Sequence, residues 1–217
     1  MKFEQFIKPL AGLSSSLLPN RQEQILLFEQ YLNIEKIWWE NFSGINRINL
    51  VIVGESPLSA EKYIYNKSYP KNSNFLYTRH IEKIASIEGK QKDLTSKADM
   101  LDALLELGVL ILDLFPYPLS RESNLNYSVL FRKQKAQQGL TQDIFLQASE
   151  WHLTRKMLEI SSKSRGHLTY AFRYARNFSF VNGLKQQHAF SNSRLCSIHK
   201  DRNDLDQTKL IKLFKQE

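Results

Sequence analysis

Two acidic residues stand where two strongly apolar runs of the sequence end. Glu55 directly follows INLVIVG, and Asp113 lies in VLILDLFPYP. Runs of this kind are typical of strands buried on both faces of a parallel sheet, where ligands bind beyond the carboxyl ends of the strands. If the two strands are neighbours, both carboxyl groups face one crevice, and burial together with mutual repulsion would hold a shared proton for acid–base chemistry near neutral pH. The alternative is that both acids only cap loop amides.

The order of elements between the two acids predicts a parallel pair of strands. A strand is expected at 48–54 and a helix at 73–89. A second helix has Ser96 as its N-cap, an acid three residues further on, and Gly108 just past its end. The second apolar run follows at once. The order strand, helix, helix, strand predicts a right-handed crossover between parallel strands.

Periodicity elsewhere predicts the rest of an α/β domain. The segment 21–42 has apolar residues near helical spacing and no internal glycine or proline, which indicates an amphipathic helix packed on the sheet. Neither a repeat nor a low-complexity linker divides the chain, so residues 1–217 are expected to form one domain. Further expected elements are a long helix at 142–163, strands at HLTYAFRYA and FSFVNG, a terminal helix at 204–216, and loops at 116–141 and 183–203.

The composition excludes several classes of protein. The chain of 217 residues has one cysteine, Cys196, so it cannot by itself supply a disulfide framework, a multi-thiolate metal centre or an iron–sulfur cluster. We therefore expect no metal and no cofactor. No run approaches the roughly 20 apolar residues that span a bilayer, and the start of the chain lacks a continuous signal-peptide core. These features predict a cytoplasmic protein without a membrane segment.

The positive charge is concentrated in the second half of the chain. The net charge is +8, yet residues 1–120 hold 13 Lys and Arg against 14 Asp and Glu, while residues 121–217 hold 17 against 8. Such asymmetry favours a polyanionic partner, because lysines and arginines placed along phosphates release condensed counterions. We expect a nucleic acid, most simply DNA. The alternative is a basic surface that is only solvated.

Aromatic residues gather around both expected strand ends. Flat rings stack on nucleobases for about 1 to 3 kcal/mol per base. The tyrosines of YIYNKSYPKNSN lie among lysines and polar residues, so we do not expect all of them to be buried. Exposed rings beside basic residues suit a nucleic acid or nucleotide, whereas the same rings could also belong to the core.

The motif VGESP, followed by tyrosines and a helix with an early phenylalanine, resembles the first motif of the uracil-DNA glycosylase superfamily. Members of that superfamily read GQDPYH, GINPG or GEAPG at this place. LILDLFPYP is similar to the superfamily strand that ends in an asparagine reading the uracil edge. The resemblance covers residues 48–120. It implies a three-layer α/β/α sandwich with a mostly parallel central sheet, and a base glycosylase that flips a base into the crevice and cleaves its N-glycosidic bond.

The resemblance implies a role for each matching residue. Three would be catalytic: Glu55 matches the acid of GEAPG, Ser56 stands where other members have a water-activating residue, and His188 in HAFSNS would steady charge on the departing base. The basic RKQK at 132–135 would hold flanking phosphates. The substrate group would be Gly54 and Pro57 of the motif, Tyr63 or Tyr65 as the wall that excludes the thymine methyl, Phe75 as the stacking ring, and Asp113 as the reader of the base edge.

The departures from the superfamily pattern leave other functions open. An ionised carboxylate at position 113 can only accept hydrogen bonds, so it suits a donor-rich base edge, whereas a protonated Asp113 could still serve uracil. Ser56 at the activating position favours a second hypothesis, a binding module that keeps the fold and has lost catalysis. A third is a nucleotide-binding or small-phosphate-binding α/β enzyme, although GESP has only one glycine for a phosphate-cradling loop.

Overall fold

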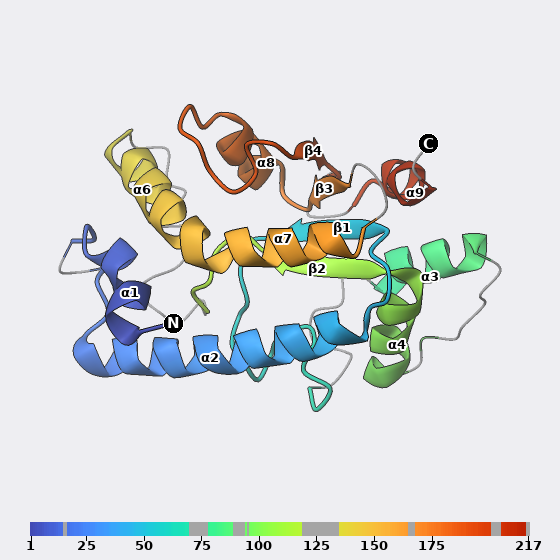
Figure 1. The fold of residues 1–217 in the computed structure, drawn as a ribbon, viewed down its shortest axis with the longest axis horizontal. Helices are drawn as coiled ribbons and strands as arrows, with labels where there is room; N and C mark the ends of the chain where they lie inside the picture. Colours follow the sequence, from blue (N-terminus) through green and yellow to red (C-terminus); the bar gives the residue numbers. More distant parts are fainter. Residues whose placement is uncertain are drawn as a thin grey trace.

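The protein is built around a four-stranded parallel sheet (Figure 1). The computed structural model describes residues 1–14, 17–69, 78–88, 94, 96–118, 135–164, 168–200 and 205–215. In this part of the chain the strand order is β2-β1-β3-β4, and each neighbouring pair is parallel. The architecture is therefore α/β with an all-parallel sheet, and it is consistent with the expected three-layer sandwich. The strands are β1 Leu50–Gly54, β2 Val109–Asp113, β3 Thr169–Phe172 and β4 Arg194–Ser197.

The two apolar runs form β1 and β2, which confirms the expected parallel pair. All five residues of β1 are buried, as expected for a central strand of a parallel sheet, which here lies between β2 and β3. The helix before β2 begins and ends as its sequence predicts. Ser96 and Asp99 form a reciprocal capping box, and Gly108 ends the helix with a φ of 65°, a left-handed conformation that glycine adopts without strain.

Helices lie along the edges and faces of the sheet. Figure 1 shows α2 running past the β2 side, while α8 and α9 lie toward β3 and β4. Within the described ranges, none of the helices is both long and apolar enough to pass through a bilayer. The helices are α1 Phe3–Ile7, the 3₁₀ helix η1 Lys8–Leu10, α2 Arg21–Gly44, α3 Thr78–Ile87, α4 Lys97–Leu107, α6 Lys135–His152, α7 Thr154–Ser162, α8 Ala175–Asn182 and α9 Gln207–Lys215.

Several expected elements in the second half are wrong. FSFVNG is not a strand but lies mainly in α8, because Asn177 and Val181, one helical turn apart, are the buried positions. The long helix at 142–163 is two helices that break at the buried Leu153, and α6 begins inside an expected loop. Strand β4 also falls in an expected loop. It has only four residues, too few for a clear period of two.

Side chains seal the outer edge of β2. The Trp38 indole donates to the Ile111 carbonyl at 3.0 Å, and the Ile111 amide donates to the Tyr65 hydroxyl at 2.6 Å. Two residues after Ile111 in β2, the His152 ring donates from Nε2 to the Asp113 carbonyl at 3.1 Å. Unpaired strand edges attract other strands, so these contacts close the sheet on this side. They also fix the main chain of Asp113 at the carboxyl end of β2.

Candidate functional site

The strand order reverses beside β1, and the predicted acids lie at that place. β2 and β3 flank β1 on opposite sides, so loops after β1 and β3 diverge and leave a ligand-binding position at their carboxyl ends. Gly54 is in register with Asp113, which puts Glu55 and Asp113 at one rim of the sheet. Arg173 joins them from the end of β3, where its amide donates to the Val53 carbonyl at 3.0 Å.

Glu55 is held by a bidentate ion pair. Arg176 donates from Nε to one carboxylate oxygen at 2.9 Å and from Nη2 to the other at 2.6 Å. The Glu55 side chain is only 10% exposed, whereas Arg176 is 49% exposed and covers it from the solvent side. Burial raises the pKa of Glu55, and the guanidinium of Arg176, the amide of Asn177 and the charge of Arg173 partly offset that rise. We name these four residues the outer cluster: Glu55, Arg173, Arg176 and Asn177.

Asp113 belongs to a second group of polar side chains. Its carboxylate lies against Gly54, where an added Cβ would come within 2.8 Å of Oδ1. Burial raises the pKa of Asp113 to about 7, while the positive charges of Lys156 and Arg173 and a hydrogen bond with the Tyr63 hydroxyl act in the opposite direction. Asp113 therefore exchanges a proton near neutral pH. The Arg173 charge acts on both Glu55 and Asp113, so this arginine is close enough to influence both carboxyl groups.

A buried ion pair lies behind Asp113. Lys156 is 3% exposed and its ammonium group bonds the Glu35 carboxylate of α2. Burial lowers the pKa of Lys156, and Glu35 and Asp113 counteract that effect. His152 is also buried, with Nδ1 3.6 Å from Glu35, and burial lowers its pKa so that it stays neutral. We name this group the inner cluster: Glu35, Tyr63, Asp113, His152 and Lys156.

The expected proton shared between Glu55 and Asp113 is not seen, because neither carboxyl group is among the causes of the other's pKa shift. Burial, rather than repulsion between the carboxylates, is the largest cause of both pKa shifts. Glu55 and Asp113 do not mainly cap loop amides either, since their side-chain bonds run to Arg176 and Tyr63. Asp113, whose pKa is raised to about 7, can therefore titrate near neutral pH without a proton shared with Glu55.

Ser56 and the two tyrosines of the motif have structural contacts. The Ser56 hydroxyl lies 2.8 Å from the Tyr117 carbonyl and 2.9 Å from the Pro57 carbonyl, so its proton is directed to the main chain and joins the loops after β1 and β2. Tyr63 and Tyr65 are both buried, Tyr63 against Asp113 and Tyr65 at the sheet edge. Phe75, the expected stacking ring, and residues 132–134 of the basic RKQK lie outside the described residues.

His188 does not follow a strand, contrary to its expected setting after FSFVNG. It lies in the loop between α8 and β4, where Nδ1 accepts from the Phe190 amide at 3.2 Å and the ring packs edge-on against Phe145. The histidine that follows the fourth strand is His199. Its Nδ1 is buried and has no partner in the part of the chain that the structure describes. In the sequence, the histidine of RLCSIH comes two residues after the strand β4, and this short apolar segment with a histidine could have indicated His199.

The arginines and the asparagine of the outer cluster were not expected from the sequence. They come from FRYARN, which straddles the end of β3 and the start of α8. The apolar alternation of HLTYAFRYA hides the boundary, since it continues past the true end of the strand at Phe172. Two arginines three residues apart after a strand are the signal that could have identified them.

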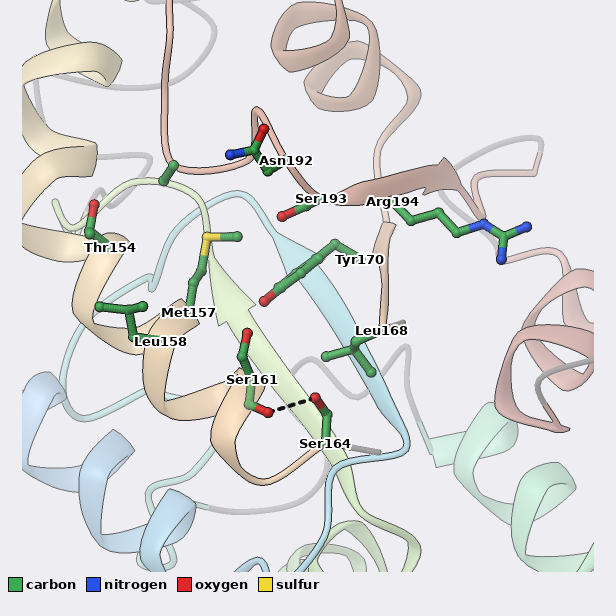
Figure 2. Close-up of a pocket in the computed structure, with 11 residues that line it drawn as sticks. Thr154, Met157, Leu158, Ser161, Ser164, Leu168, Tyr170, Asn192, Ser193 and Arg194 are labelled. Carbon is green, nitrogen blue, oxygen red and sulfur yellow. Dashed lines mark hydrogen bonds between the residues drawn. The ribbon is translucent and has the colours of Figure 1, made fainter. Parts of the chain in front are cut away.

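A pocket of about 390 Å³ lies away from this rim, on the sheet face between α7 and strands β3 and β4. Figure 2 shows Tyr170, Met157 and Ser161 directed toward one another, with Arg194 pointing away. No residue of the inner or outer cluster lines it. Its walls are Thr154, Met157, Leu158, Ser161, Ser164, Leu168, Tyr170, Ala189, Asn192, Ser193 and Arg194.

Comparisons with known proteins place no constraint on the chemistry. The chain matches no protein-family model, no curated protein and no solved structure. Within the described ranges, no three His, Cys, Asp or Glu side chains gather as a metal site.

Proposed function

We propose that this protein is a base glycosylase-like hydrolase that binds DNA and cleaves an N-glycosidic bond at the carboxyl ends of β1 and β2. One observation carries the proposal: Glu55 and Asp113 stand at one rim, on adjacent parallel strands, beside the position where the strand order reverses. The resemblance of VGESP and LILDLFPYP to the uracil-DNA glycosylase superfamily and the basic second half of the chain support the same function.

The two acids divide the chemistry between them. An extruded base meets Asp113, whose pKa is raised by burial to about 7, so that its protonated form can donate to a carbonyl oxygen or ring nitrogen of that base. As the bond from C1′ to the base breaks, its electron pair goes to the base and positive charge develops on the sugar. Glu55, once released by Arg176, stabilises that charge or orients the water that adds to C1′.

Base release from defined oligonucleotides tests the proposal. Substrates carrying uracil, hypoxanthine, xanthine or mispaired thymine are incubated with the protein, treated with alkali and separated on a denaturing gel. We expect cleavage at one of these bases, with a loss of at least tenfold in Glu55→Gln and Asp113→Asn. Glu159→Gln, which changes an exposed acid of α7, is the matched control and should act like the unchanged protein.

A binding module without catalysis is the second candidate. It is favoured by Ser56, whose hydroxyl proton is directed to main-chain carbonyls, and by Glu55, which is tied to Arg176. Salt-sensitive DNA binding without abasic sites on any substrate would support this candidate and contradict hydrolysis. Absence of nucleic-acid binding at low salt would contradict both.

A further inference from the structure

Helix α8 begins at the rim without a side-chain cap. Its N-cap residue is Tyr174, whose side chain makes no capping hydrogen bond to the amides of the first turn. Helix N-termini carry partial positive charge and unpaired N–H groups, so they attract anions. This turn also carries Arg176, and Arg173 precedes it by two positions. Three sources of positive potential therefore meet beside β1.

Asn177 gives independent evidence that this place is built for a ligand. Its side chain is fully buried, and within the described residues neither its amide nitrogen nor its amide oxygen has a partner in regular hydrogen-bond geometry. A buried amide in this state is unfavourable, because it has lost its water and gained no well-formed bond in exchange. The amide still lies close enough to the Glu55 carboxylate to lower the pKa of that group through a weak hydrogen bond, so it faces the outer cluster. A phosphate oxygen of an arriving ligand could accept a well-formed hydrogen bond from the Asn177 amide.

Glu55 already occupies this position as an internal anion. The fork of Arg176 matches a carboxylate and a phosphate equally well, since both accept two parallel N–H bonds. Arg176 is half exposed, so it can turn toward a ligand without unfolding its surroundings. An ion pair in this setting is an exchangeable contact rather than a fixed part of the core.

We infer that the first turn of α8, with Arg173, Arg176 and Asn177, is a phosphate site for the nucleic-acid strand, and that Glu55 is the anion this phosphate displaces. The inference rests on the proposed function. Binding of the strand would then release the carboxylate that the chemistry needs. The free protein would keep Glu55 neutralised, and only a bound phosphate would expose it to the sugar.

Fluorescence anisotropy with a labelled single-stranded oligonucleotide tests the site. Arg176→Ala should weaken binding about tenfold and lower the slope of log K against log salt by about 0.7, the value for one lost phosphate contact on a single strand. Arg176→Lys keeps the positive charge but loses the two parallel N–H donors of the guanidinium, so its affinity should lie between those of the unchanged protein and Arg176→Ala. Arg194→Ala is the matched control, because Arg194 is an exposed arginine at the opposite end of the sheet.

Glu55→Gln distinguishes displacement from simple attraction. Removing the internal anion should tighten oligonucleotide binding several-fold, and inorganic phosphate should compete better than it does against the unchanged protein. Equal or weaker binding by Glu55→Gln, or Arg176→Ala behaving like Arg194→Ala, would overturn the inference while leaving nucleic-acid binding intact. Failure of the unchanged protein to bind the oligonucleotide would remove the proposed function and this inference together.

Discussion

The two clusters at the rim contain similar side chains but differ in access to solvent. The inner cluster pairs Lys156 with Glu35 under α2, α6 and α7, with the lysine 3% exposed. The outer cluster pairs Arg176 with Glu55, and the arginine is 49% exposed. Both pairs join residues 121 positions apart in the chain. One pair is enclosed by the fold, while the other can open without disturbing it.

The difference separates positioning from binding. A buried pair has lost its water, so each partner depends on the other, and breaking the pair is costly. A pair whose cation is half exposed, such as Arg176 with Glu55, contributes less to stability, and its cation can turn to a ligand. We therefore assign the inner cluster to holding Asp113 in place and setting its pKa, and, under the proposed function, the outer cluster to binding the nucleic acid.

Removal of Lys156 should give the largest effect. Lys156→Met removes a lysine that is 3% exposed and leaves the Glu35 carboxylate, which is 17% exposed, without its partner, so we expect the free energy of unfolding to fall by about 3 kcal/mol. Urea denaturation followed by circular dichroism measures the change. The double variant Lys156→Met with Glu35→Gln should recover most of the loss, and a double variant as unstable as the single one would contradict the assignment.

Asp113 should make stability fall as pH rises. Its pKa is raised from 3.8 to about 7 in the folded state, so its contribution is fully present below pH 3.8 and is lost as pH rises to about 7. Between pH 5 and pH 7 the loss should be about 2 to 3 kcal/mol. Asp113→Asn removes this dependence and should be more stable than the unchanged protein at pH 8. Parallel pH profiles for the two proteins would contradict the raised pKa.

Ser56 should prove to be a structural contact of the loops. Ser56→Ala removes the hydroxyl that lies 2.8 Å from the Tyr117 carbonyl, and we expect about 1 kcal/mol less stability in thermal unfolding. Oligonucleotide affinity should stay unchanged, and so should the rate of base release wherever it is measurable. A large loss of rate with normal folding would instead return Ser56 to the water-activating role.

Arg176 should have the smallest effect on stability. Arg176→Ala leaves the Glu55 carboxyl, which is 10% exposed, without its partner, but burial already raises the pKa of Glu55, so this carboxyl can take up a proton. We therefore expect the free energy of unfolding to fall by only about 0.5 kcal/mol, whereas the proposed function expects weaker nucleic-acid binding. Urea denaturation beside Lys156→Met compares the two pairs directly. A loss as large as that of Lys156→Met would show that the two clusters do not differ as we describe.

The first half of the fold follows from local sequence, and the second half does not. INLVIVG and VLILD are short, β-branched apolar runs bounded by turn residues, which indicates buried strands, and the Ser96 capping box and Gly108 set the bounds of α4. FSFV, in contrast, satisfies the patterns of a strand and of a helix. The four residues of β4 carry no period, and only pairing with β3 makes them a strand.

The same limit applies to the site. Glu55 and Asp113 could be placed at one rim because each ends a strand whose direction is predictable. Arg176, Asn177 and Lys156 reach them only through tertiary contacts, so nothing in the local pattern gives their partners. The pKa of Asp113 likewise depends on burial, which the residue type alone does not reveal.

The close approach of Gly54 to Asp113 has a consequence for natural variation. The carboxylate fills the volume in which a side chain at position 54 would lie, so the two positions share one space. Distant homologues with alanine or serine in place of this glycine should carry a smaller residue in place of the aspartate. Covariation between positions 54 and 113 in an alignment of homologues would therefore report this contact.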